Sequence, residues 1–132
     1  MAQTDPIAEL LTRIRNAMRA RFNTVELAHS RLREAICRVL VAEGFLTAID
    51  LAGEGVQKKI KLTLRYSPTR EAIITGIQRV SRPSVRRYAG AKTMPKILGG
   101  IGLHVVSTPL GVMTDREARR KNVGGEILLR IW

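Results

Sequence analysis

The hydrophobic residues of this 132-residue chain repeat with two different periods, and these periods restrict the fold more than any other feature. In residues 6–20 and 30–44 the apolar side chains recur every three or four positions, which places them on one face of a helix. In residues 24–28 and 59–66 they alternate with polar side chains, as in a strand with one buried face. The sequence therefore predicts a fold of the α+β class.

Capping residues and turns divide the first part of the chain into six elements. Asp5 and Pro6 are typical of the start of a helix, Ser30 of the start of a second helix and Gly44 of its end. Strands are expected at residues 24–28, 45–51, 59–66 and 72–80. The first 77 residues are therefore expected to form a helix-strand-helix-strand-strand-strand module.

The remaining residues, 78–132, predict a second, mostly β module with one short helix. Strands are expected at 102–107 and 126–132, with a turn or brief helix at 94–100. One face of the last strand is expected to carry Ile127, Leu129 and Ile131. Thr114 and Glu117 have the spacing of a capping box, which predicts a helix that ends near Lys121. We therefore expect two small packed α/β modules, with the boundary after residue 77.

Charge is the outlying property of the composition. The chain has 23 Lys and Arg residues against 11 Asp and Glu residues, which gives a net charge of +12 at pH 7. A polyanionic partner is the simplest reason for a protein to tolerate that much self-repulsion. Most of the basic residues are arginines, whose planar guanidinium groups match phosphate and stack on bases. Nucleic acid is therefore the favoured partner. An anionic membrane surface and a basic surface without a function are the alternatives.

Several other functions lack the residues that they require. Cys37 is the only cysteine, so neither a disulfide framework within the chain nor a metal site of paired thiolates can form. Residues 1–6 do not resemble a signal peptide, and no apolar run approaches the roughly 20 residues that span a bilayer. We expect a cytoplasmic protein without a cofactor, a bound metal or a membrane partner.

Three residues of the types that hydrolases use lie close together in the sequence. His104 and Ser107, however, belong to one predicted strand and are three positions apart, so their side chains point to opposite faces. Asp115 therefore has no serine–histidine pair to complete, and the chain has no Gly-x-Ser-x-Gly turn. The glycines of residues 99–102 lack the strand-turn-helix context of a phosphate loop. No catalytic residue is expected.

A basic segment at residues 79–88 is the first candidate for binding RNA. It contains four arginines and one tyrosine within ten residues. Arg82, Arg86 and Arg87 are expected to bind phosphate, and Tyr88 to offer a face that stacks on a base. The alternative for the tyrosine is an ordinary place in the core or at a strand edge.

A second group of candidates lies near the C-terminus. Ser107 and Thr108 end a strand at a loop, and their hydroxyl groups can donate hydrogen bonds to bases and sugars and accept them. Gly124 and Gly125 allow the backbone to approach a partner closely. Glu126 can accept from the amino groups of bases, or it can pair with a neighbouring arginine. Because the chain has only two Phe, two Tyr and one Trp, a folded RNA fits better than a single strand bound by stacking.

Long motifs along the chain resemble one family. Residues 105–119 read Val-Val-Ser-Thr-Pro-Leu-Gly-Val-Met-Thr-Asp-Arg-Glu-Ala-Arg, and residues 124–127 read Gly-Gly-Glu-Ile. Together they closely resemble the signature of small-subunit ribosomal protein eight, of the bacterial type. Residues 5–16, 43–45 and 77–83 are also similar to that family, so the resemblance runs from end to end in matching order.

The resemblance implies two packed α/β modules in a structural constituent of the small ribosomal subunit. It also implies direct, early binding to the central domain of small-subunit ribosomal RNA, support for assembly of the platform, and neighbouring small-subunit proteins as further partners. In some bacteria, relatives also repress their own operon by binding a similar messenger RNA structure. The RNA-contacting positions that it implies are Ser107, Thr108, Pro109, Gly124, Gly125, Glu126, Tyr88, Ser30 and Arg31.

The chain departs from the family pattern at three places. Pro109 often corresponds to a serine, so one hydroxyl contact is absent here, and Ser84-Val85 stands where Gly-Leu is common. Arg31 replaces a lysine, which preserves the charge but changes the geometry of the donors. A regulator that acts chiefly on messenger RNA, and an enzyme such as a hydrolase, are the alternative functions.

Overall fold

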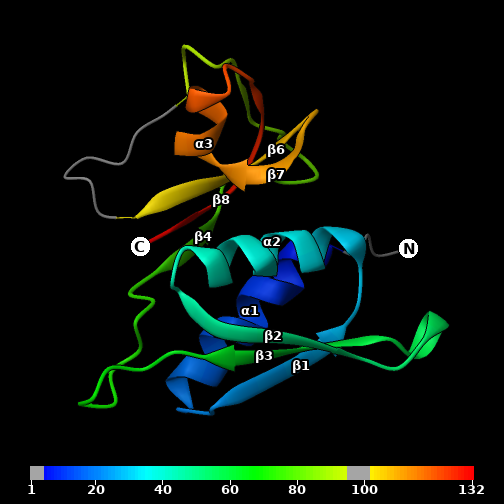
Figure 1. Ribbon diagram of the computed structural model, residues 1–132, viewed down its shortest axis with the longest axis vertical. Coiled ribbons are helices and arrows are strands. Elements are labelled where there is room, and N and C mark those ends of the chain that lie inside the picture. Colours follow the sequence, from blue (N-terminus) through cyan, green and yellow to red (C-terminus); the bar gives the residue numbers. More distant parts are fainter. Residues whose placement is uncertain (1–4, 95–101) are drawn as a thin grey trace. The chain divides into compact units, whose positions relative to one another are not determined.

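The chain forms two compact units, Met1–Ile74 and Thr75–Trp132, in a computed structural model that describes residues 5–94 and 102–132 (Figure 1). Each unit combines α-helix with an antiparallel sheet, which confirms the predicted α+β class. The division of the chain after residue 77 stays a prediction.

One sequence prediction falls on the residues that the structure does not describe. The turn or brief helix expected at 94–100 lies outside the described residues except for Met94. The glycine segment 99–102 lies outside them except for Gly102.

The first unit combines two helices with a three-stranded sheet. Its elements are α1 (Pro6–Arg19), β1 (Thr24–Ala28), α2 (Arg31–Ala42), β2 (Leu46–Ala52), a short 3₁₀ helix (Gly55–Gln57) and β3 (Lys59–Leu64). Strand β3 lies between β1 and β2 and pairs with both in antiparallel register (Figure 1). Ile60, Leu62 and Leu64 of β3 are buried, whereas Lys59 and Lys61 are exposed, as the alternating pattern predicts.

Local signals in the sequence determine where the two helices begin and end. The carboxylate of Asp5 accepts the N–H of Ile7 at 3.1 Å, and the hydroxyl of Ser30 accepts the N–H of Arg33 at 3.1 Å. Each bond satisfies a backbone donor that has no partner within its helix. Gly44 follows α2 with a φ of +83°, in the left-handed region that glycine tolerates best. The predicted caps are therefore confirmed.

A buried arginine joins three segments of the first unit. The side chain of Arg33 in α2 is 8% exposed, and its guanidinium donates to the backbone oxygens of Pro6 (3.0 Å) and Ala28 (2.9 Å). It also pairs with the carboxylate of Glu9 at 2.6 Å. A buried cation is tolerated only where its donors are matched in this way. Arg33 thereby fixes the starts of α1 and α2 and the end of β1 with respect to one another.

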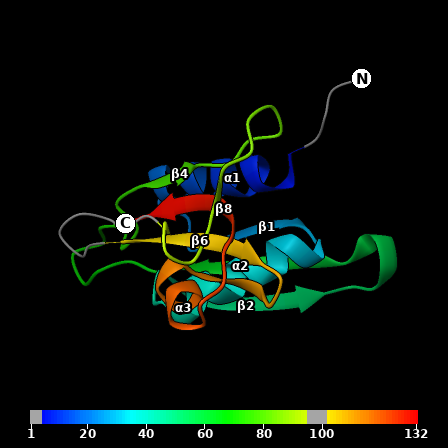
Figure 2. The same cartoon turned by 90° about the horizontal axis from the view of Figure 1, so that it is seen from above.

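The described residues of the second unit form a five-stranded antiparallel sheet and one short helix. The elements are β4 (Ile77–Arg79), β5 (Tyr88–Ala89), β6 (Leu103–Thr108), β7 (Gly111–Thr114), α3 (Asp115–Arg120) and β8 (Gly125–Ile131). Strand β8 lies between β4 and β6 and pairs with both (Figure 2). The short strand β5 pairs with β8 on the same side as β4. A core cluster joins the sheet to α3 and consists of Met94, Val106, Met113, Ala118 and Ile127.

The strand expected at 72–80 differs from the observed one. Only Ile77–Arg79 forms a strand, and it pairs with β8 of the second sheet instead of joining the first. The C-terminal residue explains the difference, because the backbone oxygen of Trp132 accepts the N–H groups of Thr75 and Gly76. A Cβ atom at Gly76 would lie 2.2 Å from the indole ring, so only glycine permits this close approach.

A bulge in β8 changes the predicted faces of the last strand. Val105 pairs with Leu129 and the next residue, Val106, pairs with Ile127, so that Leu128 is an extra residue. Val105 and Val106 point to opposite faces, and their partners do the same. The expectation that Ile127 and Leu129 share a face is therefore wrong. The bulge also explains why residues 127, 128 and 129 are all buried.

The buried Asp115 at the start of α3 stabilises the fold of the second unit. Its carboxylate accepts the backbone N–H of His104 at 3.2 Å and pairs with Arg119 at 3.1 Å, and the imidazole Nδ1 of His104 lies 3.8 Å away. Burial by itself raises the pKa of this carboxyl, but the hydrogen bonds from His104 and Arg119 outweigh it and lower the pKa to about 2. Asp115 is therefore ionised in the folded protein at neutral pH.

Replacing Arg33 by alanine is expected to lower the free energy of unfolding by about 3 kcal/mol, because its three acceptors lose their buried donor. Urea unfolding followed by circular dichroism measures the change. The matched control is Arg38→Ala in the same helix, whose side chain is 55% exposed and pairs with Glu34. This control should lose less than about 0.5 kcal/mol. Similar losses for the two variants would contradict the role of Arg33.

The low pKa of Asp115 predicts how stability depends on pH. A folded pKa of about 2, below the ordinary 3.8, favours the folded state above pH 4, and this contribution disappears as the pH falls from 4 to 2. Its size is roughly 2 kcal/mol. Asp115→Asn should flatten the acid side of a stability–pH curve, whereas Asp50→Asn, at an exposed site in β2, should leave it unchanged. An unchanged curve for Asp115→Asn would show that the carboxylate contributes nothing.

Candidate nucleic-acid interface

The register of the second sheet brings three of the predicted residues into one row. Tyr88 of β5 lies opposite Glu126 of β8, and Glu126 lies opposite Ser107 of β6. Cross-strand partners project on the same side of a sheet, so the three side chains share a face. Ile127 and Val106, the next residues along their strands, project on the other face and join the core around α3. The row therefore lies outside that core, and its tyrosine is 71% exposed.

Glu126 is held by two side chains from the basic segment. The hydroxyl of Ser81 donates to its Oε2 atom, and Arg86 donates to the same atom at 3.0 Å. The hydroxyl of Ser81 in turn accepts the backbone N–H of Arg87 at 3.2 Å. Of the two roles considered for Glu126, the pairing with an arginine is thus present. Its Oε1 atom has no hydrogen-bond partner among the residues that the structure describes, so it remains available to a base.

The arginines of the basic segment stand on a short hairpin, residues 82–87. The N–H of Arg82 donates to the oxygen of Val85 at 2.9 Å, and the N–H of Val85 donates back to the oxygen of Arg82 at 3.0 Å. Arg82, Arg86 and Arg87 are all exposed. The side chain of Arg86 remains 47% exposed although it pairs with the carboxylate of the row. The hairpin therefore presents cations to solvent beside the polar row.

The turn after β6 uses one of its two hydroxyl groups internally. The hydroxyl of Thr108 donates to the oxygen of Gly111 at 2.8 Å and accepts the N–H of Leu110 at 3.1 Å. Thr108 is buried, so its side chain shapes the turn, while Pro109 in the same turn is exposed. Ser107 is half-buried, and its hydroxyl makes no hydrogen bond within the described part of the chain. Ser107 is therefore the hydroxyl that a partner can use.

The two glycines before Glu126 are required by the sheet itself. A Cβ atom at Gly125 would lie 2.0 Å from the backbone oxygen of Ser107, and one at Gly124 would lie 2.5 Å from that of Ala89. Any side chain there would push β8 away from β5 and β6 and separate the residues of the row. Gly124 and Gly125 are therefore needed because the backbones of the neighbouring strands lie very close to them. Their contact with RNA stays a prediction.

Ser30 and Arg31 belong to the first unit, whereas the other ten predicted residues belong to the second. The hydroxyl of Ser30 already caps α2. Arg31, the first residue of that helix, is exposed. Their contact with RNA stays a prediction.

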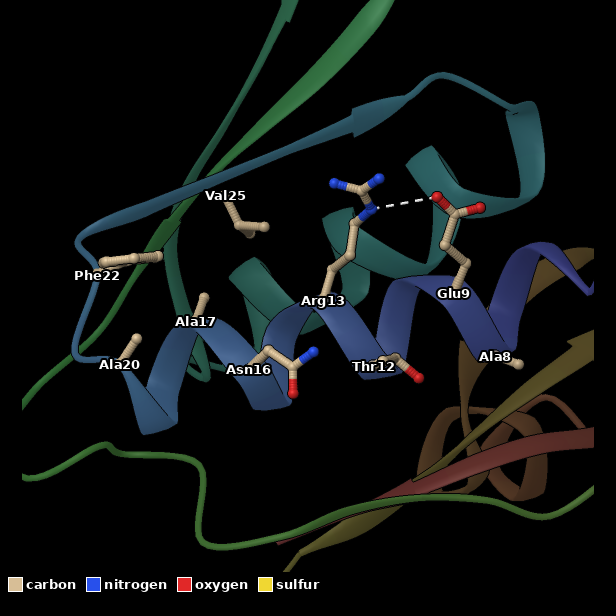
Figure 3. A pocket seen from close by; sticks show the side chains of 9 residues that line it. All are labelled: Ala8, Glu9, Thr12, Arg13, Asn16, Ala17, Ala20, Phe22 and Val25. Carbon is tan, nitrogen blue, oxygen red and sulfur yellow. Dashed lines mark hydrogen bonds and ion pairs between the residues drawn. The ribbon is translucent and has the colours of Figure 1, made fainter.

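An open pocket in the first unit lies between α1 and β1 (Figure 3). It is lined by Ala8, Glu9, Thr12, Arg13, Asn16, Ala17, Ala20, Phe22 and Val25. The two charged residues of this lining, Glu9 and Arg13, pair with each other at 3.1 Å, as the dashed line in Figure 3 shows. The lining contains no serine, cysteine or histidine that could act as a nucleophile or a base. The pocket therefore gives no support to the catalytic alternative.

The described residues, 5–94 and 102–132, offer no group of side chains for chemistry other than binding. In these ranges no three His, Cys, Asp or Glu side chains gather where they could hold a metal ion. Burial raises the pKa of the Cys37 thiol to about 12, which keeps it protonated and unreactive. The described helices are also too short or too polar to cross a membrane.

Ser81 organises the row, and the sequence reasoning did not single it out. It lies four positions after the buried Ile77, a spacing that places both on one face of an extended segment, so its inward direction could have been inferred. The group that accepts the hydrogen bond of its hydroxyl could not be inferred, because Glu126 is 45 positions away along the chain.

Comparison with known proteins agrees with the resemblance noted in the sequence. The family model of ribosomal protein S8 matches residues 5–132. The chain is 45% identical to the small ribosomal subunit proteins uS8 of Caldanaerobacter subterraneus and Lactobacillus delbrueckii, over 132 residues and the full length of each protein. It is 46% identical to the protein of that name from Solibacter usitatus, over 129 residues and 98% of both chains. With such matches over its whole length, the chain belongs to the ribosomal protein S8 family.

Proposed function

We propose that this protein is anchored in the small ribosomal subunit by direct binding to the central domain of the small-subunit ribosomal RNA. Membership of the ribosomal protein S8 family makes the chain a structural constituent of the small subunit and confirms that it is not an enzyme. The family assignment leaves open which surface binds RNA, and the geometry of the second unit supports one answer.

The row formed by Tyr88, Glu126 and Ser107 is the observation that carries this proposal. It combines an exposed aromatic face, a carboxylate with one open acceptor and a hydroxyl that donates and accepts. These groups suit base edges and ribose hydroxyls, which long cations would contact with less selectivity. The arginine hairpin beside the row supplies the phosphate contacts that any RNA site requires.

The distribution of charge also favours the second unit. The sequence from Thr75 to Trp132 has eleven basic and three acidic residues, a net charge of +8. The sequence up to Ile74 has twelve basic and eight acidic residues, a net charge of +4. Attraction for a polyanion is therefore stronger where the row and the hairpin lie.

Two further functions follow from the same proposed contact. A protein bound to the central domain early would support assembly of the subunit platform, with neighbouring small-subunit proteins as later partners. A messenger RNA that folds like the ribosomal site would meet the same side chains, so repression of the protein's own operon belongs to the proposal.

A binding titration at several salt concentrations tests the proposed function. It compares a central-domain ribosomal RNA fragment with a perfectly paired RNA helix of equal length. We expect a preference for the fragment of at least about a thousandfold, the low end of specific nucleic-acid recognition. Equal affinity with a steep dependence on salt would mean that charge alone binds RNA, and the proposed site would be wrong.

Ser107→Ala is expected to weaken binding of the fragment by about 1–3 kcal/mol, because a buried polar group of the RNA loses its partner. Binding of the paired helix and the salt dependence should stay unchanged. Thr12→Ala, which removes an exposed hydroxyl of α1, is the control and should bind as the wild type does. Undiminished binding of the fragment by Ser107→Ala would remove this serine from the site.

Arg82→Ala, unlike Ser107→Ala, should change the binding of both RNAs and its dependence on salt. Its exposed guanidinium is expected to contact phosphate, so its loss should weaken both RNAs and lower the slope of log affinity against log salt by about one. The same titration measures both quantities. A loss confined to the fragment, with an unchanged slope, would show that Arg82 reads bases instead of phosphate.

A further inference from the structure

We propose that Ser81, which makes no contact with RNA itself, is a positioning residue whose hydroxyl sets Glu126 for selective RNA binding, while its backbone anchors the start of the hairpin of residues 82–87. The inference rests on the proposed function, since it concerns the same row of side chains. It adds a residue that is fully buried and therefore not a contact itself.

The backbone of Ser81 is fixed against the central strand of the second sheet. Its N–H donates to the oxygen of Ile127 at 3.0 Å, and the N–H of Val80 donates to the oxygen of Leu128 at 3.1 Å. Because the backbone of Ser81 is held on β8 and the residue is fully buried, its hydroxyl can adopt few orientations. Its position is set by the sheet before any partner arrives.

The hydroxyl of Ser81 uses its donor and an acceptor at the same time. It donates to Oε2 of Glu126 and accepts the backbone N–H of Arg87 at 3.2 Å. A serine hydroxyl has one hydrogen to donate, so that hydrogen is committed to the carboxylate. The serine therefore links the acidic residue of the row to the end of the arginine hairpin.

Both ends of the hairpin are anchored on β8 around this serine. The Ser81 N–H binds Ile127 at the start, and the N–H of Ile127 donates to the oxygen of Arg87 at 2.8 Å at the end. Arginines on an anchored hairpin lose less conformational freedom when they bind than arginines on a free loop. The anchoring thus favours binding without adding a contact.

Glu126 is the residue whose position would change most if the serine hydroxyl were absent. Arg86 alone would then hold the carboxylate, and a half-exposed ion pair of this kind contributes little to geometry or stability. With the hydroxyl in place, two donors converge on Oε2 and leave Oε1 as the atom that can accept from a base amino group. The selectivity of the row therefore depends on Ser81 acting through Glu126.

The test measures affinities of the full-length protein for the central-domain fragment and for the paired helix. Ser81→Ala is expected to bind the fragment about tenfold more weakly, the effect of losing one hydrogen bond to a charged group, and to bind the paired helix as the wild type does. The matched control is Ser67→Ala in the first unit, because the hydroxyl of this half-buried serine also accepts a backbone N–H, that of Glu71 at 3.1 Å. The control should leave both affinities unchanged.

A double-variant cycle distinguishes positioning from simple destabilisation. If Ser81 acts through Glu126, adding Ser81→Ala to Glu126→Ala should weaken fragment binding by less than about twofold further. Thermal unfolding of each variant shows whether it is folded. Where Ser81→Ala does not fold, Ser81→Cys takes its place, because the thiol has a similar size but is a weak donor.

Two failures can be told apart. Equal binding of both RNAs by the wild type would overturn the proposed function, and the inference with it. If the wild type discriminates, the inference alone is overturned by any of three results. These are unchanged fragment binding by Ser81→Ala, an equal loss for both RNAs, and losses that multiply fully in the double variant.

Discussion

Strand β8 is the element on which the second unit depends, because its backbone pairs with β6 on one side and with β4 and β5 on the other. Two features of the backbone allow this one strand to pair with three others. Gly124 and Gly125 allow the close approach of neighbouring chains, and the bulge at Leu128 turns Ile127 into the core. Without these features Glu126 would not lie between Tyr88 and Ser107, and the row would not exist.

Charge is handled differently inside the protein and on its surface. Buried charged groups, such as Arg33 and Asp115, are matched by partners close enough to offset their burial. The arginines of the hairpin are exposed, and one of them is held by Glu126. Acidic residues such as Glu9, Asp115 and Glu126 thus fix structure, while the net charge of +12 that remains over the whole chain favours a polyanionic partner.

Much of the fold could be predicted from local patterns, whereas the site depended on distant pairing. Helix caps at Asp5, Ser30 and Thr114 are properties of neighbouring residues, and all three were foreseen correctly. The pairing of Ile77–Arg79 with β8 could not be predicted from local patterns, because β8 is about 50 positions further along the chain. The same holds for Ser81, whose role depends on a carboxylate far away in the sequence. The motif resemblance named Ser107 and Glu126 together, but only the strand register explains why they act as neighbours.

Nuclear magnetic resonance gives the most direct test of where RNA binds. The amide signals of the full-length protein would be followed while the central-domain fragment is added. We predict that the largest changes occur at Ser107, Glu126 and residues 82–88, with little change at the residues that line the pocket of the first unit. The largest changes at α3 or at that pocket, with the row unaffected, would contradict the proposal that the row binds RNA.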